Sequence, residues 1–331
     1  MIISQTPLRI SFLGGGTDFE SYYKNHAGLV VSAAIDKYIF VIIKERFDSL
    51  IVLNYSKKEI RNSVEEIEHE FVREAMMKTG IKEGVEITMI ADIPSEGSGL
   101  GSSSSVVVGL LNAMYAYTGK QVTAEQLAKE ACDIEIKKCK KPIGKQDQYI
   151  AAYGGLCSIK FNKTGKVNVD KIEISEREIY NLSSNLFLYY TGVTRKSADV
   201  LEGLKSNISA KKNISDLNEI KKLAVEAKSA IEAGNIDKLG NLLNQNWKHK
   251  KKLSEGISNQ FLDDMYSKAI KAGASGGKIA GAGGGGFFLL YCKKQFHDAL
   301  KKQMKDFKEM PFHVEKDGSK IIFNYRRYSW K

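Results

Sequence analysis

The feature that most constrains the fold is the stretch at residues 94–117, PSEGSGLGSSSSVVVGLLNAMYAY. Three glycines at alternate positions precede four consecutive serines, and an apolar run follows at once. The apolar run predicts a buried helix over residues 103–117. The chain must therefore bring a flexible turn and a row of hydroxyls to the N-terminus of a buried helix.

The same stretch has the chemistry of an anion site. A helix N-terminus exposes unpaired N–H groups and carries a partial positive charge, and glycines before it let successive N–H groups point into one concavity. Phosphate is the usual ligand of such a site, and a serine hydroxyl in the first turn can bind Mg²⁺. The alternative is a flexible loop with an ordinary serine cap. One cap needs one serine, whereas this chain has four in a row, so we favour a phosphate-binding loop.

Two familiar nucleotide-binding patterns do not describe the chain. The sequence contains no G-x-x-x-x-G-K-[ST], which excludes a Walker-type NTPase. Residues 281–286 (GAGGGG) satisfy G-x-G-x-x-G, but FFLLYC follows and predicts a strand, where a dinucleotide-binding fold needs a helix.

Length and the order of predicted elements favour two domains of the α+β class. The chain has 331 residues, more than one hydrophobic core usually serves. Strands and helices alternate irregularly along it, which favours α+β over a doubly wound sheet. We place the boundary where the helix-rich part begins, which gives domains at residues 1–184 and 185–331.

Composition indicates a soluble cytoplasmic protein. No stretch approaches about 18 uninterrupted apolar residues, and no basic segment precedes the apolar residues at the N-terminus, so we expect neither a membrane span nor a secretion signal. The four cysteines form no C-x-x-C pair, which favours free thiols in a reducing compartment.

The net charge of +11 raises the question of nucleic acid. The lysines are scattered, however, and the two dense runs at 137–141 and 248–252 lack interleaved aromatic residues. We interpret these runs as solvated helix ends and expect no nucleic-acid partner. A phosphorylated substrate would also suit a basic protein.

Three motifs occur in order along the chain: PLRISFLGGGTD (7–18), PSEGSGLGSSSS (94–105) and KIAGAGGGG (278–286). Together they resemble the motifs of the GHMP kinase superfamily, which is named after galacto-, homoserine, mevalonate and phosphomevalonate kinases. The resemblance implies a two-domain α+β fold with a ribosomal-protein-like N-terminal domain, a ferredoxin-like C-terminal domain and an active site between them. It also implies ATP and Mg²⁺ as cofactors and phosphoryl transfer to a hydroxyl group.

The first motif narrows the resemblance to one branch. Galactokinase-like members carry G-E-H-T-D where residues 14–18 of this chain read GGGTD. Glycines therefore stand in place of the glutamate and the histidine, which removes two side chains that contact the sugar and leaves more space in the sugar site. With GKQDQYIAAYGG at 144–155 and YTGVTRKS at 190–197, this version resembles the D-glycero-D-manno-heptose 7-phosphate 1-kinases and related fucokinases. The resemblance implies phosphorylation of the anomeric (C1) hydroxyl of heptose 7-phosphate, a step toward nucleotide-activated heptose for surface polysaccharide. L-fucose or another sugar is the alternative substrate, and a non-catalytic sugar or nucleotide sensor is the alternative of another class.

The resemblance assigns catalytic roles to two residues. Asp147, in GKQDQ, matches the family's catalytic aspartate and would orient or deprotonate the anomeric hydroxyl. Arg9, in PLRIS, matches the basic residue of the first motif and would stabilise charge on the transferred group or make the hydroxyl more acidic. Without the motifs, both would be read as ordinary solvated residues.

The metal site implied by the resemblance is a serine of the GLGSS turn with a glutamate upstream of the aspartate. Mg²⁺ takes few protein oxygens and keeps several waters, so two ligands suffice. Ser103 fits best, with Ser102 and Ser104 as alternatives. Glu135, on a helix predicted over 123–139, is the matching carboxylate, and Asp133 is the fallback. A solvent-facing glutamate on an amphipathic helix is the plain alternative for Glu135.

The remaining expected contacts fall into two groups. The first group would bind the phosphates of ATP and comprises Gly97, Ser98, Gly99, Leu100, Gly101, Ser102, Ser103 and Ser104. The second would bind the sugar and comprises Arg9, Gly15, Gly16, Thr17, Asp18, Lys145, Asp147, Arg195, Gly283 and Gly284. Lys145 and Arg195, with Lys196, are the candidates for the 7-phosphate. We expect Gly281–Gly286 to form a close-packed turn near the phosphates or the sugar, and a homodimer is left open.

Overall fold

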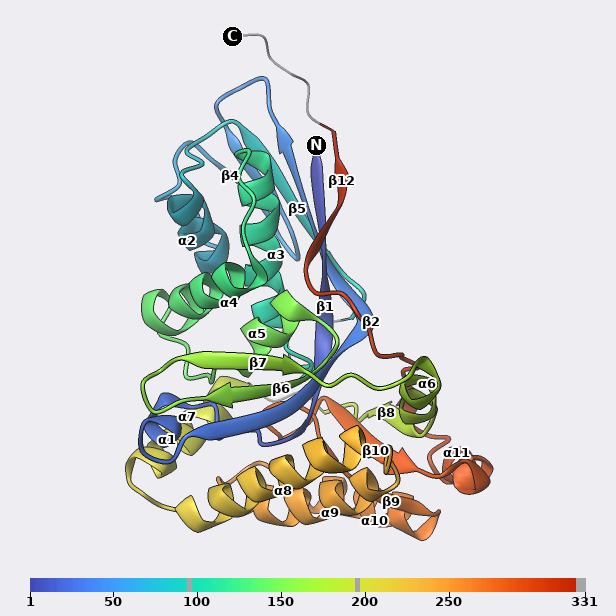
Figure 1. Cartoon of the computed structure of the whole chain (residues 1–331). Helices are drawn as coiled ribbons and strands as arrows, with labels where there is room; N and C mark the ends of the chain where they lie inside the picture. The colour runs from blue at the N-terminus through green and yellow to red at the C-terminus, as the bar shows by residue number, and fades with distance from the viewer. Residues whose placement is uncertain (94–96, 194–196, 326–331) are drawn as a thin grey trace.

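The computed structural model describes residues 1–93, 97–193 and 197–325, and within these ranges the strands form two sheets (Figure 1). The first sheet has the order β12-β1-β2-β5-β3-β4, with β6 on β2 and β7 on β6. Its strands are β1 (Ile2–Leu13), β2 (Gly28–Glu45), β3 (Ile51–Asn54), β4 (Lys58–Arg61), β5 (Val85–Ala91), β6 (Leu156–Phe161), β7 (Val167–Lys171) and β12 (Lys320–Asn324). The second sheet is antiparallel, in the order β11-β8-β10-β9: β8 (Leu186–Tyr190), β9 (Ala274–Ile279), β10 (Phe287–Cys292) and β11 (Lys308–Glu309).

The helices divide between the two sheets, as Figure 1 shows. On the first sheet lie α2 (Glu70–Thr79), α3 (Ser102–Tyr117), α4 (Ala124–Cys132) and α5 (Gln146–Tyr153), with a π-helical turn, η1 (Asp133–Lys138), after α4. Next to the second sheet lie α9 (Lys238–Lys250) and α10 (Gln260–Lys271), whereas α8 (Ile214–Glu232) packs on α9 and on strands β1 and β2 of the first sheet. The remaining helices are α1 (Glu20–His26), α6 (Glu176–Ser184), α7 (Ser197–Ser209), the 3₁₀ turn η2 (Lys294–Phe296) and α11 (His297–Gln303). The presence of both helices and two sheets confirms the α+β class.

Helix α3 is the centre of the first layer because it is apolar on nearly every side. Val107, Leu110 and Met114 are fully buried, and a helix that is apolar all round belongs in a core. A Cβ on Gly109 would lie 2.9 Å from the Thr6 Oγ1 atom, so the glycine lets β1 pass directly against the helix. This packing brings the N-terminus of α3 to the strand that carries Arg9.

Strand β1 changes its pairing just before Arg9. Pro7 is opposite Tyr38 on β2, but Leu8 is opposite Ile35, so two residues of β2 are extra at this point. Such a bulge bends a strand and re-aims the side chains beside it. The bulge thus lies at the edge of the site described below.

The division into domains stays a proposal. The boundary between residues 184 and 185 falls between α6 and β8, that is, between strands of the first and second sheets. β12 then returns to the first sheet and pairs antiparallel with β1. In the described ranges, no helix combines the length and the apolar character that crossing a membrane requires.

Candidate active site

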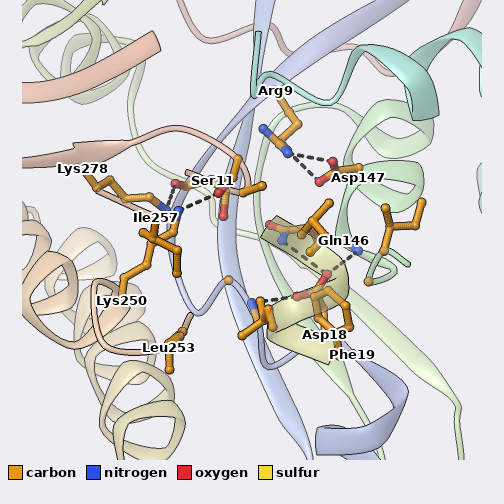
Figure 2. A pocket seen from close by; sticks show the side chains of 18 residues that line it. Arg9, Ser11, Asp18, Phe19, Gln146, Asp147, Lys250, Leu253, Ile257 and Lys278 are labelled. Atoms are coloured by element: carbon orange, nitrogen blue, oxygen red, sulfur yellow. Dashed lines mark hydrogen bonds and ion pairs between the residues drawn. The ribbon is translucent and has the colours of Figure 1, made fainter. Parts of the chain in front are cut away.

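One pocket collects residues from both sheets and from the helix ends between them (Figure 2). It lies where the C-terminal part of β1, the start of α5, the end of α9 and the turn after β9 meet. It is lined by Arg9, Ser11, Gly15, Gly16, Asp18, Phe19, Ile143, Gly144, Gln146, Asp147, Leu201, Leu204, Lys250, Leu253, Ile257, Lys278, Gly281 and Ala282.

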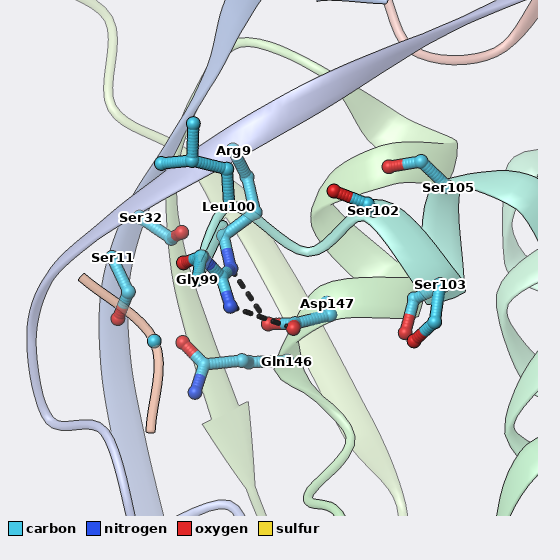
Figure 3. Close-up of polar contacts among 12 residues, drawn as sticks. Arg9, Ser11, Ser32, Gly99, Leu100, Ser102, Ser103, Ser105, Gln146 and Asp147 are labelled. Atoms are coloured by element: carbon cyan, nitrogen blue, oxygen red, sulfur yellow. Dashed lines mark hydrogen bonds and ion pairs between the residues drawn. The ribbon is translucent and has the colours of Figure 1, made fainter. Parts of the chain in front are cut away.

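The two predicted catalytic residues form an ion pair in this pocket (Figure 3). The Nε atom of Arg9 donates to Oδ1 of Asp147 at 2.7 Å, and Nη2 donates to Oδ2 at 2.6 Å. The third nitrogen, Nη1, donates to the carbonyl oxygen of Gly99 at 2.6 Å. A planar guanidinium that binds both carboxylate oxygens fixes them in orientation. The arginine therefore ties the carboxylate of Asp147 to the glycine–serine loop.

That loop has the backbone of an anion site. Gly97, Gly99 and Gly101 adopt positive φ angles of 71°, 73° and 77°, which residues with a Cβ rarely adopt. Gly101 is the N-cap of α3, and no side chain bonds to the helix N-terminus from that position. The first-turn N–H groups of α3 are therefore left for a ligand. The Ser98 hydroxyl lies 2.9 Å from that of Ser102, and this contact keeps the loop compact.

The glycine-rich third motif packs against this loop backbone to backbone. A Cβ on Gly99 would lie 2.5 Å from the carbonyl oxygen of Ala280, and a Cβ on Gly281 would lie 2.6 Å from the Cα atom of Gly99. The expected close-packed turn is present, and its glycines are needed for contact with the second motif. Gly283 and Gly284 pack against Ile257, with the Gly284 N–H bonded to the Ile257 carbonyl oxygen at 2.9 Å, and their contact with a sugar stays a prediction.

Glu135 lies at the head of α3 and is fully buried. The Ser103 hydroxyl donates to its Oε1 atom at 2.9 Å, the Ser104 hydroxyl donates to Oε2 at 2.7 Å, and Gln148 also donates to Oε2. Burial raises the pKa of Glu135 to about 7, although these hydrogen bonds oppose the shift. The helix predicted over 123–139 changes at this point into the π-helical η1, a local form often found at functional sites. The solvent-facing alternative for Glu135 is excluded by its burial.

These groups fit a small divalent cation. A carboxylate and a hydroxyl are the hard oxygen ligands that Mg²⁺ prefers, and in the described part of the chain Glu135 has only uncharged hydrogen-bond partners. Ser103 is exposed whereas Ser104 is buried, so a cation arriving from solvent meets Ser103 first. Asp133 points outward and pairs with Lys137 at 2.9 Å. Within the described ranges no group of three His, Cys, Asp or Glu residues could hold a metal, so any site here relies on few protein ligands.

Asp18 lies on the floor of the pocket. Its carboxylate accepts from the backbone N–H of Gly16 at 3.0 Å and from the backbone and side-chain nitrogens of Gln146 at 3.2 and 3.3 Å. Burial, and then the charge of Asp147, raise the pKa of Asp18. A Cβ on Gly144 would lie 1.9 Å from Oδ2 of Asp18, so the glycine of GKQDQ makes room for this carboxylate.

The other predicted sugar ligands differ in their placement. Gly15 and Gly16 line the pocket. Thr17 is buried, and its hydroxyl donates to the Gly14 carbonyl oxygen at 2.7 Å, so it holds the turn together. Lys145 is not among the lining residues, and its ammonium lies 5.0 Å above the ring of Tyr23. Arg195 and Lys196 lie outside the described residues, so the earlier assignment of the 7-phosphate stays a prediction.

Two lysines of the pocket were missed by the sequence analysis. The Lys250 ammonium donates to the carbonyl oxygens of Ile279 at 3.1 Å and Gly281 at 2.5 Å, and the Lys278 ammonium donates to those of Ser11 at 2.7 Å and Phe12 at 3.2 Å. Burial lowers the pKa of Lys250 to about 7 and that of Lys278 well below its ordinary value.

The interpretation of residues 248–252 as a solvated helix end is therefore wrong for Lys250, which is only 8% exposed. Trp247 and Asn246, three and four positions earlier, are also buried. Residues at this spacing share one face of a helix. The tryptophan was the sequence signal that could have placed Lys250 on the inner face.

Comparison with known proteins gives consistent matches over most of the chain. Residues 66–155 match the family model for the GHMP kinases N terminal domain, and residues 227–307 match that for the GHMP kinases C terminal. The chain is 31% identical over 330 residues to D-glycero-alpha-D-manno-heptose 7-phosphate kinase of Campylobacter jejuni, covering 95% of this chain and 97% of that protein.

Two further matches bear on the choice of sugar. The crystal structure of a D-glycero-D-manno-heptose 1-phosphate kinase from Bacteroides thetaiotaomicron superposes with a TM-score of 0.82 at 25% identity, covering 98% of this chain and 100% of that chain. A bifunctional fucokinase/GDP-fucose pyrophosphorylase of Arabidopsis thaliana is 24% identical over 354 residues, which cover 98% of this chain but only 32% of that protein.

Proposed function

The chain belongs to the GHMP kinase family, and from that premise we propose that it phosphorylates the C1 hydroxyl of D-glycero-D-manno-heptose 7-phosphate to give heptose 1,7-bisphosphate. It is an ATP-dependent phosphotransferase that acts on a sugar. The proposal goes further in its details. It names the heptose as the sugar, its anomeric carbon as the position, the cytoplasm as the location, and nucleotide-activated heptose synthesis for surface polysaccharide as the role.

The single observation that carries the proposal is the contact of Arg9 with both Asp147 and Gly99. Phosphoryl transfer needs an oriented nucleophile beside the phosphate site. An acceptor hydroxyl bonded to Asp147 would lie next to the loop that binds the phosphates, because one arginine side chain spans the two.

Each residue then has a defined task. Asp147 takes the proton of the C1 hydroxyl as its oxygen forms a bond to the γ-phosphorus, and the electrons of the breaking P–O bond leave with ADP. Arg9 donates to both carboxylate oxygens of Asp147. Each oxygen has two lone pairs, so each keeps one for that proton. Arg9 and the first-turn N–H groups of α3 stabilise the negative charge on the phosphoryl group. Ser103 and Glu135 would hold Mg²⁺, which when bound neutralises charge on the phosphates of ATP.

A panel of sugars in an assay of ADP release tests the proposal. We expect the highest kcat/KM with heptose 7-phosphate, and a product in which phosphorus NMR detects a second phosphate on the anomeric carbon. Faster turnover of L-fucose would make the protein a fucokinase. Binding of sugar without any release of ADP would favour the sensor.

A further inference from the structure

The pocket has two walls of opposite charge. Asp147 and Asp18 lie on one side, and Lys250 and Lys278 lie on the other, as the view in Figure 2 shows. The lysine wall comes from the last residue of α9 and from β9, and neither lysine belongs to the catalytic group described above. Lys250 is 8% exposed and Lys278 is 2% exposed.

In the described ranges, neither lysine has a carboxylate partner. Each ammonium donates to two backbone carbonyl oxygens, and an ammonium has three N–H donors. In its protonated form each lysine therefore has one donor left for a group in the pocket. Burying a cation without a counter-ion is costly, so two such residues on one wall indicate that an anion binds there.

Unpartnered polar atoms on the same pocket point to an oxygen-rich ligand. The Ser11 hydroxyl and the Oε1 atom of Gln146 are buried and have no hydrogen-bond partner. Both residues line the pocket, and the carbonyl oxygen of Ser11 is one of the acceptors of Lys278. Buried polar groups are normally bonded. A ligand with acceptor oxygens at the lysine wall and a hydroxyl near Gln146 would satisfy both atoms.

We propose that Lys250 and Lys278, with the Ser11 hydroxyl, bind the phosphate group that the sugar substrate already carries. The inference rests on the proposed function, because heptose 7-phosphate bears its phosphate at the opposite end from C1. With C1 at Asp147, we place that phosphate at the lysine wall, because Asp147, Lys250 and Lys278 line the same pocket. A phosphate dianion accepts several hydrogen bonds and supplies the counter-charge that both lysines lack. This proposal is an alternative to the predicted assignment of the same group to Lys145 and Arg195, of which Lys145 lies outside the pocket lining.

Lys250→Met is the decisive variant, and Lys251→Met is its matched control. Lys251 is the next residue along the chain, but its side chain is 36% exposed and pairs with Asp263 at 3.0 Å. We expect Lys250→Met to raise KM for heptose 7-phosphate by about 10–100-fold with kcat changed less than about threefold, since a hydrogen bond to a charged group is lost. Lys250→Met should lose far more kcat/KM with heptose 7-phosphate than with unphosphorylated heptose, whereas Lys251→Met should lose little with either sugar. An equal loss with both sugars would overturn the inference, because it would place Lys250 at the transferred phosphoryl group or in a purely structural role.

A second measurement needs no sugar and so separates this inference from the proposed function. The melting temperature is measured with inorganic phosphate while AMPPNP and Mg²⁺ saturate the nucleotide site. Phosphate should stabilise the wild type and Lys251→Met but not Lys250→Met, and Ser11→Ala, which removes one donor and little volume, should show a reduced shift. Two results would overturn the phosphate site whichever sugar is the substrate. One is no shift in the melting temperature of the wild type, and the other is a shift in Lys250→Met and Ser11→Ala as large as that of the wild type. If Lys250→Met does not fold, the Ser11→Ala comparison decides alone.

Discussion

Asp147 and Glu135 are two carboxylates of one site with opposite surroundings. Asp147 is partly exposed and already paired with Arg9, whereas Glu135 is fully buried among uncharged donors. The chain thus supplies a permanent cation to one carboxylate and, among the described residues, none to the other. A carboxylate that is already paired with a cation suits proton transfer at a fixed position. A buried carboxylate without a cationic partner suits metal binding, although its burial lowers the stability of the fold.

The largest effect is expected at Asp147. Asp147→Asn keeps the shape of the side chain but removes the proton acceptor, so kcat should fall by about 10²–10⁴-fold. ATP binding, measured by calorimetry, should change by less than about threefold, because residues 97–104 are untouched. Asp133→Asn is the control, since that carboxylate pairs with Lys137 on the outside. Near-normal turnover of Asp147→Asn would remove this residue from the mechanism.

The next effect is expected at Glu135. Glu135→Gln keeps hydrogen-bonding capacity but loses the negative charge, so the Mg²⁺ concentration for half-maximal activity should rise by about 10–100-fold. A titration of activity with Mg²⁺ at fixed ATP measures this change. An unchanged Mg²⁺ requirement would show that the cation binds elsewhere.

The same substitution should stabilise the protein in metal-free buffer at high pH. The folded pKa of Glu135 is raised from 4.5 to about 7, so between these values the folded carboxyl binds more protons than the unfolded one. Stability contributed by this group therefore falls as pH rises from 4.5 through about 7. With EDTA, Glu135→Gln should melt about 2–6 °C above the wild type at pH 8 and close to it at pH 5. Melting curves at both pH values measure this difference, and a lower melting temperature at pH 8 would contradict the unpaired state of Glu135.

The smallest effect separates the two serines beside Glu135. Ser103 is exposed and Ser104 is buried, although both donate to the same carboxylate. Ser103→Ala should raise the Mg²⁺ requirement by about 3–10-fold with little change in melting temperature. Ser104→Ala should lower the melting temperature, because it removes a buried hydrogen bond to a charged group, and should leave the Mg²⁺ requirement within about twofold. The reverse pattern would make Ser104 the ligand.

Sequence signals within a few residues were enough to predict the parts of the site that lie at the ends of helices and strands. The glycine–serine run predicted the turn before α3 because glycine and serine act within a few residues of their own position. The motif resemblance brought Arg9 and Asp147 into one site, and the structure pairs them. The class of the fold followed from the irregular alternation of strands and helices.

Features that depend on contacts between distant segments could not be predicted in this way. Nothing near Gly144 indicates that its missing side chain leaves room for Asp18, which lies 126 positions earlier. A lysine in the run 248–252 looks solvated until the second sheet covers one face of α9. The change from α-helix to π-helix at Glu135 has no composition signal of its own.

The contact between Gly99 and Gly281 joins the glycine–serine loop to the turn of the third motif. At this contact no side chain separates the loop proposed to bind the nucleotide from the turn whose carbonyl oxygen accepts from Lys250. If ligand binding on one side shifts this contact, the affinity on the other side changes by the same factor in both directions. Binding of the nucleotide and binding of the sugar would then be coupled, so that whichever ligand binds first changes the affinity for the other.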